Sequence, residues 1–500
     1  MLYSFFNTLI KGYLKYRYTR IQAMYSQSPD LQAQLWAKQW PELYKTSYRP
    51  QFTKLGTLSI QDYKQAFPII QYEDIADHIL MMMDGKESVL WPGKISWYAK
   101  SSGTTNDKSK YIPITDTNLF DNHVTSSWDA MAIVYAHTPD SRIFDKKNIL
   151  MGGSLVPNTG SIYVGDISAV LLNRMPAVGR PFYSPDFETA LMQDWERKIE
   201  LMAEICSKDD IAMLAGVPTW TLVLLRRILE VSGKENMLEV WPHVRTYLHG
   251  GVGFDPYIEQ FKKYFPSDDF NYYEVYNASE GYFAVQDQKG VKGMLLLTDN
   301  GIYYEFIPLE KSGEAHPDTL TLNEVEVGKD YVIVISNSSG LWRYKPGDVV
   351  RFTSVAPFRI EVSGRTKHYI NVFGEEVMVH NTDYAIKETS AACGGSIIDY
   401  TVGPIFMEEN KGGHHWLIEF DQLPENISLF SDTLDQKLRS INSDYDAKRY
   451  KDLALAPLKL DVMPKGTFKK WLVNKGKLGG QSKIPRLSND RNYITELLNL

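Results

Sequence analysis

Cysteine, excess charge and repetitive sequence are all scarce in this 500-residue chain. Cys206 and Cys393 are its only cysteines and lie far apart, which excludes a disulfide framework and a Cys-x-x-Cys metal or redox pair. A reducing, cytoplasmic location is therefore predicted. The formal net charge of -7 gives no general attraction to nucleic-acid phosphates, so no nucleic-acid partner is expected.

Long apolar runs are missing as well. No stretch reaches the ~18 apolar residues that a membrane-spanning helix requires. The N-terminal run 1–10 is apolar, but Lys11 ends it, no basic segment precedes it and no small-residue cleavage site follows it. We interpret it as a packed helix and expect no membrane association. The sequence leaves the oligomeric state open, and a monomer fits it.

Two common catalytic motifs are absent. The chain contains no G-x-x-x-x-G-K-[ST] loop, so the P-loop nucleoside triphosphatases lose their main sequence support. It also has no H-E-x-x-H zinc spacing. His414 and His415 are adjacent, and on a strand they would face opposite sides.

The chain is long enough for at least two domains, because 500 residues exceed what one hydrophobic core usually organises. Apolar and aromatic residues at helical spacing predict a mainly helical scaffold over residues 1–90. From about Lys147 onward, short apolar strands alternate with helices, which is typical of an α/β domain. The expected strands are 149–151, 211–215, 244–248, 272–276, 303–307, 331–336 and 358–362, and a helix is expected at 218–231.

A domain boundary is predicted at Gly364-Arg365-Thr366-Lys367, after the strand 358–362, because the pattern restarts beyond it. Residues 1–364 would form the large domain and residues 365–500 a small α+β domain. The strands expected in the small domain are 397–402, 416–420 and 458–462.

The segment 97–110, WYAKSSGTTNDKSK, combines hydroxyl side chains, a glycine and lysines. Glycine lets successive backbone N–H groups turn toward one anion, hydroxyls add donors without bulk, and a lysine adds positive charge. This composition is typical of a phosphate-binding loop, although a surface connection can have the same composition. We assign phosphate binding to Ser101, Ser102, Gly103, Thr104 and Thr105, and Lys108 and Lys110 are the candidates for the positive charge.

Two further segments follow in order, YNASEGYF at 276–283 and WRYKPGDVV at 342–350. Together the three segments resemble the acyl-adenylate-forming, firefly luciferase-like superfamily. Within it they are most similar to the auxin-responsive acyl acid amido synthetase family, which has plant members and bacterial relatives. The resemblance runs from about Trp97 to Arg486.

The resemblance implies both a fold and an activity. A large N-terminal adenylate-forming domain of mixed sheets and helices would carry a small mobile C-terminal lid, with the hinge near Arg365. The enzyme would use ATP and Mg²⁺ to convert a small carboxylic acid to its adenylate. An amine, expected to be an amino acid, would then displace AMP and form an amide.

Glu280 and Asp348 are the predicted acidic site residues. A glutamate after a strand suits Mg²⁺, a hard cation that prefers carboxylate oxygen, although a loop carboxylate can also simply form a salt bridge. Asp348 follows Pro346-Gly347, a pair that fits a type II turn. The turn does not explain the aspartate, and the resemblance implies that it binds the ribose hydroxyls.

The remaining roles come mostly from the resemblance. Ser279 would contact the α-phosphate or the acid, and Lys483, in the segment 481–486, would stabilise the adenylation transition state from the lid. The resemblance selects Lys110 over Lys108 as the phosphate-binding lysine of the loop, because Lys110 stands before a hydrophobic-x-Pro step. Nucleotide-binding residues would further include Gly250, Gly251, Tyr276, Asn277 and Arg365. Asn277 and Ala278 stand where many relatives have glycine and serine or threonine. Arg343 and Tyr344 have simpler explanations in an ion pair and core packing.

Three alternatives stay open. Coenzyme A could replace the amine and give a thioester. The segment 277–281 is close to the G-x-S-x-G elbow of serine hydrolases, with Ser279 as nucleophile and His414 or His415 as base, but Asn277 replaces the first glycine. A non-catalytic nucleotide-binding protein is the third alternative, which the presence of Glu280, Asp348 and Lys483 disfavours.

Overall fold

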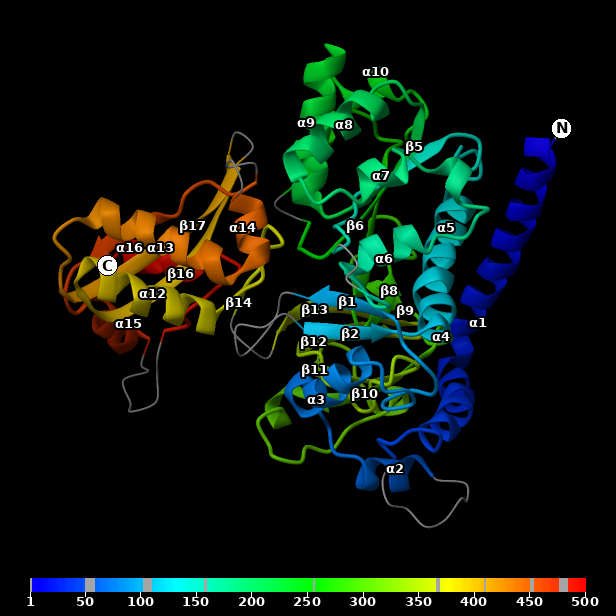
Figure 1. The fold of residues 1–500 in the computed structure, drawn as a ribbon, viewed down its shortest axis with the longest axis horizontal. Helices are drawn as coiled ribbons and strands as arrows, with labels where there is room; N and C mark the ends of the chain where they lie inside the picture. Colours follow the sequence, from blue (N-terminus) through cyan, green and yellow to red (C-terminus); the bar gives the residue numbers. More distant parts are fainter. Residues whose placement is uncertain are drawn as a thin grey trace.

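The computed structural model of the chain describes residues 2–49, 59–101, 110–156, 160–254, 257–365, 369–408, 411–449, 454–475 and 484–500. Its helices and strands form a large N-terminal part and a smaller C-terminal part that lie side by side (Figure 1). No helix among these residues is long and apolar enough to cross a membrane.

A mixed ten-stranded sheet is the centre of the large part, with the strand order β10-β11-β12-β13-β9-β8-β7-β6-β5-β3. The pairs joining β3, β5, β6 and β7 are parallel, and the other pairs are antiparallel. The strands are β3 (Lys147–Leu150), β5 (Ile211–Gly216), β6 (Thr246–Gly250), β7 (Asn271–Ala278), β8 (Gly281–Val285), β9 (Met294–Leu296), β10 (Ile302–Pro308), β11 (Asp330–Asn337), β12 (Asp348–Val355) and β13 (Phe358–Arg365).

A second sheet in the large part has the order β2-β1-β4. Strand β1 (Trp97–Ser101) pairs antiparallel with β2 (Lys110–Ile114) and parallel with β4 (Tyr163–Gly165). The segment predicted to bind phosphate is thus the connection between β1 and β2. Its central residues, 102–109, fall outside the described residues.

The longest helix, α1 (Leu2–Leu43), runs along one side of the large part (Figure 1). Gln32 fixes it to the sheet by donating to the carbonyls of Thr298 and Ile302. The other helices and helical turns of this part are α2 (Ile60–Ala66), α3 (Tyr72–Met83), α4 (Asp116–Asn118), the π-helical turn η1 (Leu119–Val124), α5 (Thr125–His137), α6 (Ile167–Asn173), η2 (Arg180–Phe182), α7 (Phe187–Ala190), α8 (Trp195–Cys206), α9 (Pro218–Ser232), α10 (Met237–Val240), α11 (Ile258–Tyr264), η3 (Leu309–Lys311) and η4 (Leu322–Glu324).

Helix α9 shows how local sequence sets its ends. Pro218 occupies its first turn, where the missing N–H costs nothing, and Gly233 ends it with φ of 66°. The predicted helix 218–231 is therefore confirmed within one residue. The strand expected at 149–151 is displaced, because β3 covers Lys147–Leu150.

The C-terminal part contains a three-stranded sheet in the order β16-β17-β18 and a short β14-β15 pair. Its strands are β14 (Tyr369–Ile370), β15 (Val377–Met378), β16 (Ser396–Glu408), β17 (Lys411–Gln422) and β18 (Lys459–Met463). Its helices are α12 (Val379–Cys393), α13 (Ile427–Ile441), α14 (Ser443–Arg449), α15 (Thr467–Asn474) and α16 (Asn492–Leu498). The mixed α/β class with a small C-terminal α+β unit is thus as predicted.

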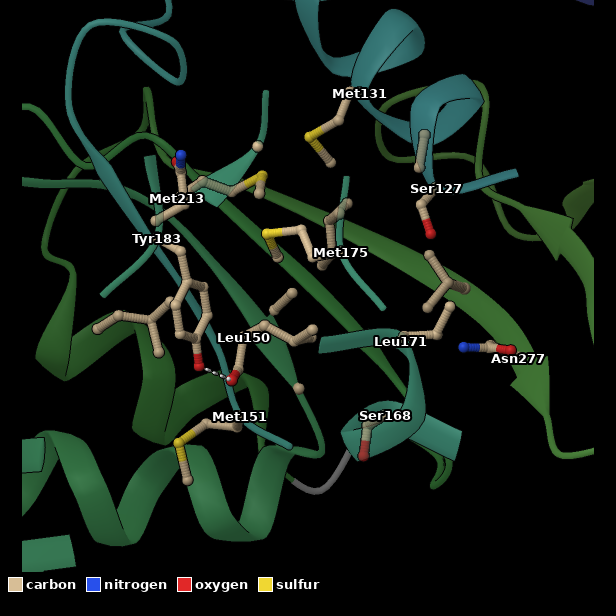
Figure 2. A pocket seen from close by; sticks show the side chains of 18 of the residues that line it. Ser127, Met131, Leu150, Met151, Ser168, Leu171, Met175, Tyr183, Met213 and Asn277 are labelled. Atoms are coloured by element: carbon tan, nitrogen blue, oxygen red, sulfur yellow. Dashed lines mark hydrogen bonds between the residues drawn. The ribbon is translucent and has the colours of Figure 1, made fainter. Parts of the chain in front are cut away.

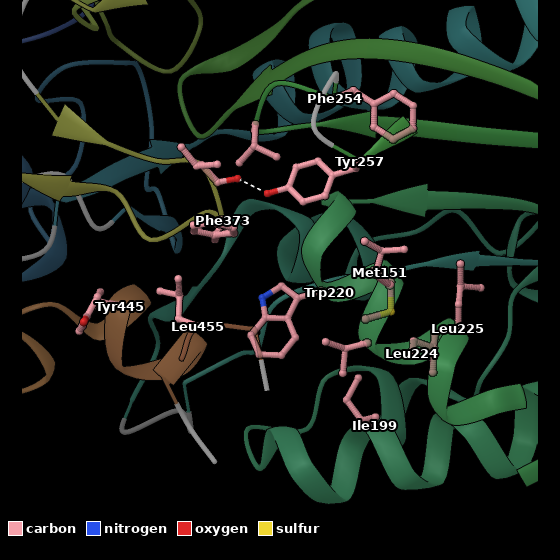
Figure 3. Packing of buried hydrophobic residues seen from close by; sticks show 14 of the residues in the cluster. Met151, Ile199, Trp220, Leu224, Leu225, Phe254, Tyr257, Phe373, Tyr445 and Leu455 are labelled. Carbon is pink, nitrogen blue, oxygen red and sulfur yellow. Dashed lines mark hydrogen bonds between the residues drawn. The ribbon is translucent and has the colours of Figure 1, made fainter. Parts of the chain in front are cut away.

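One hydrophobic cluster crosses from the large part to the small part. Trp220 on α9 belongs to the same buried cluster as Phe373 and Leu455 of the C-terminal part (Figure 3). Two hydrogen bonds to the segment 371–376 strengthen this contact. Thr219 Oγ1 donates to the backbone carbonyl of Phe373, and the Tyr257 hydroxyl donates to that of Val372. The two parts are therefore docked against each other.

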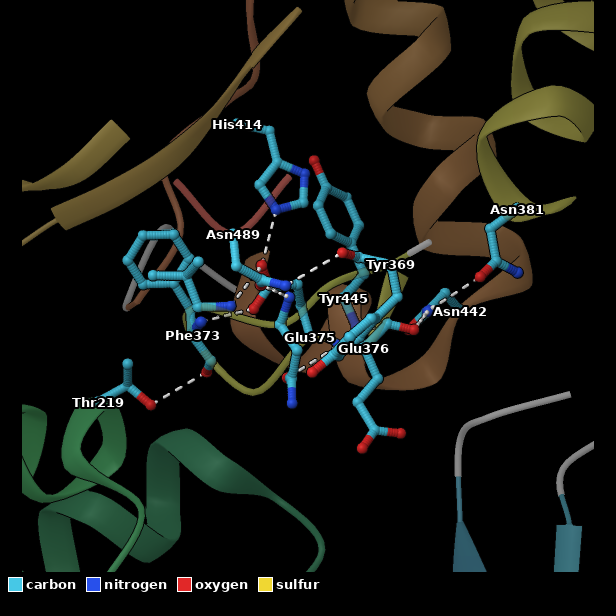
Figure 4. A network of polar contacts seen from close by, with 12 residues as sticks. Thr219, Tyr369, Phe373, Glu375, Glu376, Asn381, His414, Asn442, Tyr445 and Asn489 are labelled. Atoms are coloured by element: carbon cyan, nitrogen blue, oxygen red, sulfur yellow. Dashed lines mark hydrogen bonds and ion pairs between the residues drawn. The ribbon is translucent and has the colours of Figure 1, made fainter. Parts of the chain in front are cut away.

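A buried polar network holds the docking segment 371–376 in shape (Figure 4). Glu375 accepts hydrogen bonds from the N–H groups of Val372 and Phe373. It also accepts one from His414 Nε2, at 2.9 Å. Glu375 and His414 are both fully buried, so the carboxylate depends on these donors for compensation. The network connects β17 of the small sheet to the contact with the large part.

Candidate active site

Glu280 lies in the tight turn between β7 and β8 and is 8% exposed. Asn337 Nδ2, at the end of β11, donates to the backbone carbonyl of Glu280 at 2.8 Å. Asn337 Oδ1 in turn accepts from the N–H of Ser339. The backbone that carries the Glu280 carboxylate is thus fixed by a separate strand.

Asp348 and Tyr276 meet although they come from different sequence segments. The Tyr276 hydroxyl at the end of β7 donates to Asp348 Oδ2 at 2.5 Å. Both residues are less than a tenth exposed. Asp348 also stands opposite Arg365 in the pairing of β12 with β13, which places the predicted hinge residue at the same end of the sheet. Tyr276, Asp348 and the backbone of Arg365 are therefore brought together.

Gly250 is the last residue of β6, beside β7, and Gly251 follows it. A Cβ on Gly250 would lie 2.3 Å from the Val275 carbonyl oxygen, so only glycine allows this approach between the strands. Gly251 has φ of +81°, a conformation that side chains rarely adopt. Because Gly250 pairs with Val275, both glycines lie one strand away from Tyr276.

Ser101 and Lys110 are paired at the end of the β1–β2 hairpin where the connection 102–109 begins and ends. The Lys110 ammonium lies over the ring of Tyr72, 5.6 Å from its centroid. Ser102, Gly103, Thr104, Thr105 and Lys483 lie outside the described residues. Beyond residue 483, Arg486 pairs with Asp399 at 2.5 Å, which fixes the following chain to β16.

A cavity of about 400 Å³ lies beside this site, between the parallel strands and helices α5 and α6 (Figure 2). Gly250, Gly251 and Asn277 form part of its wall, so the cavity adjoins the predicted nucleotide segments. No Asp, Glu, Lys, Arg or His is found among the described residues that line it. Its apolar lining includes Trp128, Met131, Met151, Leu171, Met175, Phe182 and Met213.

Asn277 is turned toward the cavity in Figure 2, with its amide nitrogen on the cavity side. The sequence predicts a nucleotide contact for Asn277, and the structure places this residue on the wall of the apolar cavity, together with Gly250 and Gly251. A β-bulge between Tyr276 and Asn277 produces this orientation, since a bulge re-aims the side chains that follow it.

His123 was missed in the sequence, where it is an isolated histidine. It lies in the π-helical turn η1 and is fully buried. Burial lowers the pKa of His123 to about 4, and the neighbouring Asn277 side chain partly opposes this shift. His123 is therefore neutral at physiological pH.

The geometry does not support a serine hydrolase. Ser279 sits in a strand-to-strand turn between β7 and β8, whereas the nucleophile elbow requires a strand followed by a helix. The two suggested bases are also engaged in the small part: His414 Nε2 bonds Glu375, and His415 Nε2 bonds Asp461 at 2.7 Å. As expected, these adjacent histidines face opposite sides of β17.

Arg343 and Tyr344 have the structural roles expected of them. Arg343 forms a buried ion pair with Glu305 and donates to the carbonyls of Lys64 and Phe67. Tyr344 is fully buried in the core of the large part.

Three family models match successive parts of the chain. They are the GH3 family N-terminal domain at residues 17–159 and 154–270, the GH3 family central domain at 295–365 and the GH3 family C-terminal domain at 380–492. Together they cover most of the 500 residues.

Two curated relatives match over nearly the whole chain. Jasmonoyl-L-amino acid synthetase GH3.5 of Oryza sativa subsp. japonica is 24% identical, over 89% of this chain and 90% of its own length. Indole-3-acetic acid-amido synthetase GH3.4 of Arabidopsis thaliana is 22% identical, over 88% and 86%.

Two solved structures share the fold. AtGH3.15 acyl acid amido synthetase in complex with 2,4-DB aligns with 97% of this chain and 96% of that chain, with a TM-score of 0.63 and 18% identity. 2-Hydroxyisobutyryl-CoA ligase in complex with 2-HIB-AMP and CoA aligns over 96% and 92%, with a TM-score of 0.52 and 13% identity.

Proposed function

This chain belongs to the GH3 family, and from that premise we propose that it is an acyl acid amido synthetase. It activates a small carboxylic acid with ATP and transfers the acyl group to an amine, expected to be an amino acid. Pyrophosphate leaves in the first step and AMP in the second. The relatives named above are a jasmonoyl-L-amino acid synthetase and an indole-3-acetic acid-amido synthetase, and these names support the same reaction class.

One observation carries the proposal. The apolar cavity shares Gly250, Gly251 and Asn277 with the segments predicted to bind nucleotide. An acid bound with its apolar body in the cavity would therefore present its carboxylate beside Tyr276 and Asp348. Adenylation needs this proximity, because most of its catalysis comes from positioning the attacking carboxylate oxygen and stabilising the charge that develops on the phosphate oxygens.

The proposed division of labour follows the site. Asp348, oriented by the Tyr276 hydroxyl, accepts hydrogen bonds from the ribose hydroxyls. Ser279 contacts the α-phosphate or the acid, and Arg365 binds the nucleotide at the hinge to the lid, residues 365–500. The roles of Lys483 and of Ser101 to Lys110 in holding phosphates rest on the sequence.

Glu280 fits a Mg²⁺ ligand because it is a buried carboxylate on a backbone fixed by Asn337. Mg²⁺ is usually held by one or two carboxylates together with substrate phosphates, where it neutralises phosphate charge. Glu280 would supply the protein oxygen for such a site.

The acid is expected to have an apolar body without a second charge. The described lining of the cavity offers no cation and no carboxylate to compensate one, and burying an unpaired charge is costly. Four methionines in the lining, which are flexible and polarisable, suit a body of irregular shape.

The location is proposed to be the cytoplasm, with a monomer as the working assembly. Cys206 and Cys393 are both free thiols, which suits a reducing compartment.

Exchange of labelled pyrophosphate into ATP, screened across apolar carboxylic acids, tests the first step. Exchange that depends on one or a few acids supports the proposal. No exchange with any acid, for an enzyme that binds ATP and Mg²⁺, would overturn it. Amino acids and coenzyme A are then compared as acceptors with the active acid, and AMP release with only coenzyme A would favour the thioester alternative.

A further inference from the structure

The wall of the cavity contains few groups that could hold the oxygen atoms of an acid. Asn148 Nδ2 donates to the carbonyls of Ile143 and Phe182, at 2.7 and 3.0 Å. The Ser127 hydroxyl donates to the carbonyl of His123, and the Tyr183 hydroxyl donates to that of Leu150. The N–H and O–H donors of these three side chains are therefore used within the protein, whereas Asn148 Oδ1 is buried without a partner among the described residues. Ser168 Oγ, also in the lining, accepts from the N–H of Gly153.

Asn277 differs from them. Its side-chain oxygen is buried and its amide nitrogen lies on the cavity side (Figure 2). An amide has one acceptor end and one donor end, so the orientation of the side chain decides which end a ligand meets. Asn277 therefore presents a neutral N–H donor to the cavity.

His123 is the neighbour that favours this orientation. It lies beside Asn277, and both its ring nitrogens are buried without a hydrogen bond of good geometry to any described residue. A neutral imidazole carries one N–H donor and one acceptor nitrogen, so it could meet either end of the amide. Against the lowering by burial, the contact with Asn277 raises the pKa of His123, which is the effect of a ring that donates to the amide oxygen, and that oxygen is the buried end of the amide. The ring therefore faces the Asn277 oxygen and leaves the nitrogen toward the cavity.

Two irregularities of the backbone converge on this pair. His123 lies in a π-helical turn and Asn277 follows a β-bulge, and both kinds of irregularity are frequent at functional sites. Asn122 fixes the turn to β8: its side chain accepts from the N–H of Tyr282 and donates to the carbonyls of Tyr282 and Asn300. The position of His123 is thus set by three hydrogen bonds of its neighbour.

We propose that Asn277 is a specificity-determining residue that donates a hydrogen bond from Nδ2 to a carboxylate oxygen of the bound acid, and that His123 is a positioning residue that orients it. This inference rests on the proposed function, since it names a contact within the same site. Asn277 is three residues from Glu280, so a carboxylate held by its amide lies at the nucleotide end of the cavity.

The first test measures KM for the acid and for ATP separately, by pyrophosphate exchange with the full-length enzyme. Asn277→Ala is expected to raise the KM for the acid by about 10-fold to 100-fold, because a hydrogen bond to a charged group is lost. The KM for ATP should stay within about twofold of wild type. Asn277→Asp should raise the KM for the acid further, because its carboxylate repels that of the acid. A rise confined to the KM for ATP would overturn the proposal and return Asn277 to the nucleotide.

The second test separates positioning by His123 from a purely structural role. His123→Leu should raise the KM for the acid, and adding it to Asn277→Ala should cause little further rise, because both changes remove the same contact. Independent, multiplicative effects on this KM would overturn the role of His123. His137→Leu, at the end of the adjoining helix α5, is the matched control and should leave the KM for the acid unchanged.

Direct binding keeps the test informative if a variant is inactive. Titration with the active acid in the absence of ATP should change the intrinsic tryptophan fluorescence, to which Trp128 in the cavity wall contributes. Asn277→Ala with a wild-type melting temperature should show the same weakening by titration as by kinetics. Wild-type binding by this variant would overturn the inference. A wild-type enzyme that exchanges no pyrophosphate would contradict the proposed function instead.

Discussion

The Tyr276 hydroxyl donates a hydrogen bond to Asp348 across 72 positions of sequence, at 2.5 Å. This contact joins the second and third sequence segments of the site. The Tyr276 hydroxyl holds Asp348 Oδ2 in place, and this fixes the orientation of the whole Asp348 carboxylate. The pair is therefore a structural unit whose parts can be tested separately.

Tyr276→Phe should raise the KM for ATP about threefold to tenfold, because it removes one hydrogen bond and keeps the ring. Asp348→Ala should raise it more, by about 10-fold to 100-fold, if the carboxylate binds ribose. Initial rates of pyrophosphate exchange at varied ATP provide the measurement. Tyr303→Phe is the control, because the Tyr303 hydroxyl is buried without a partner among the described residues. An unchanged KM for ATP in Asp348→Ala would rule out the ribose contact.

Glu280→Gln should lower pyrophosphate exchange by about a hundredfold, because loss of a charged metal ligand is worth several kcal/mol. ATP binding should largely survive, since glutamine keeps the shape of the side chain. The measurement is exchange across a series of Mg²⁺ concentrations, where higher Mg²⁺ should restore part of the rate. Glu314→Gln, an exposed carboxylate elsewhere, should behave as wild type. Full activity of Glu280→Gln at low Mg²⁺ would remove Glu280 from the metal site.

Gly250→Ala should destabilise the large part by about 1–3 kcal/mol, because its Cβ would overlap the Val275 carbonyl and push β6 from β7. Gly253→Ala is a matched control three residues away, where a Cβ meets nothing within 4 Å. Urea unfolding of the two variants provides the comparison. Equal stability of the two variants would mean that β6 and β7 tolerate the shift.

Local signals in the sequence predicted much of the fold. Proline and glycine marked the two ends of α9, and apolar runs marked β5 and β11. Glu280, Asp348 and Tyr276 could be predicted as site residues because their segments have characteristic residues in a fixed order. Helix ends, apolar strands and short motifs all depend on residues that are close together in the sequence, so a single sequence is enough to predict them.

The cavity could not be predicted, because its wall comes from side chains of ordinary core type on several separate elements. Met131 on α5 and Met213 on β5 line the cavity, but their neighbours in the sequence do not distinguish them from core residues that line no cavity. His123 is one isolated histidine among ten, and only the fold brings it beside Asn277. For the same reason the sequence predicts a nucleotide contact for Asn277 and gives no sign that Asn277 also lines a cavity.

Lys448 provides a test of the docking between the two parts. It lies on α14 of the small part, with its ammonium 4.6 Å from the ring centroid of Trp220 on α9. Burial lowers the pKa of Lys448, which means that the docked structure disfavours its charged form. The cost is present at neutral pH and disappears as the pH rises toward the ordinary lysine value, where the unfolded chain loses its proton as well.

Lys448→Met should therefore stabilise the protein at pH 7, by on the order of 1 kcal/mol, because the buried charge is removed and the apolar stem is kept. The advantage should shrink as the pH is raised toward 10, which melting curves across this range can measure. Lys387→Met, an exposed lysine of the same part, should have no such pH-dependent effect. If Lys448→Met lowered the melting temperature at pH 7, the contact of the ammonium with Trp220 would outweigh its desolvation. The docking would then depend on a cation–π contact rather than on apolar packing alone.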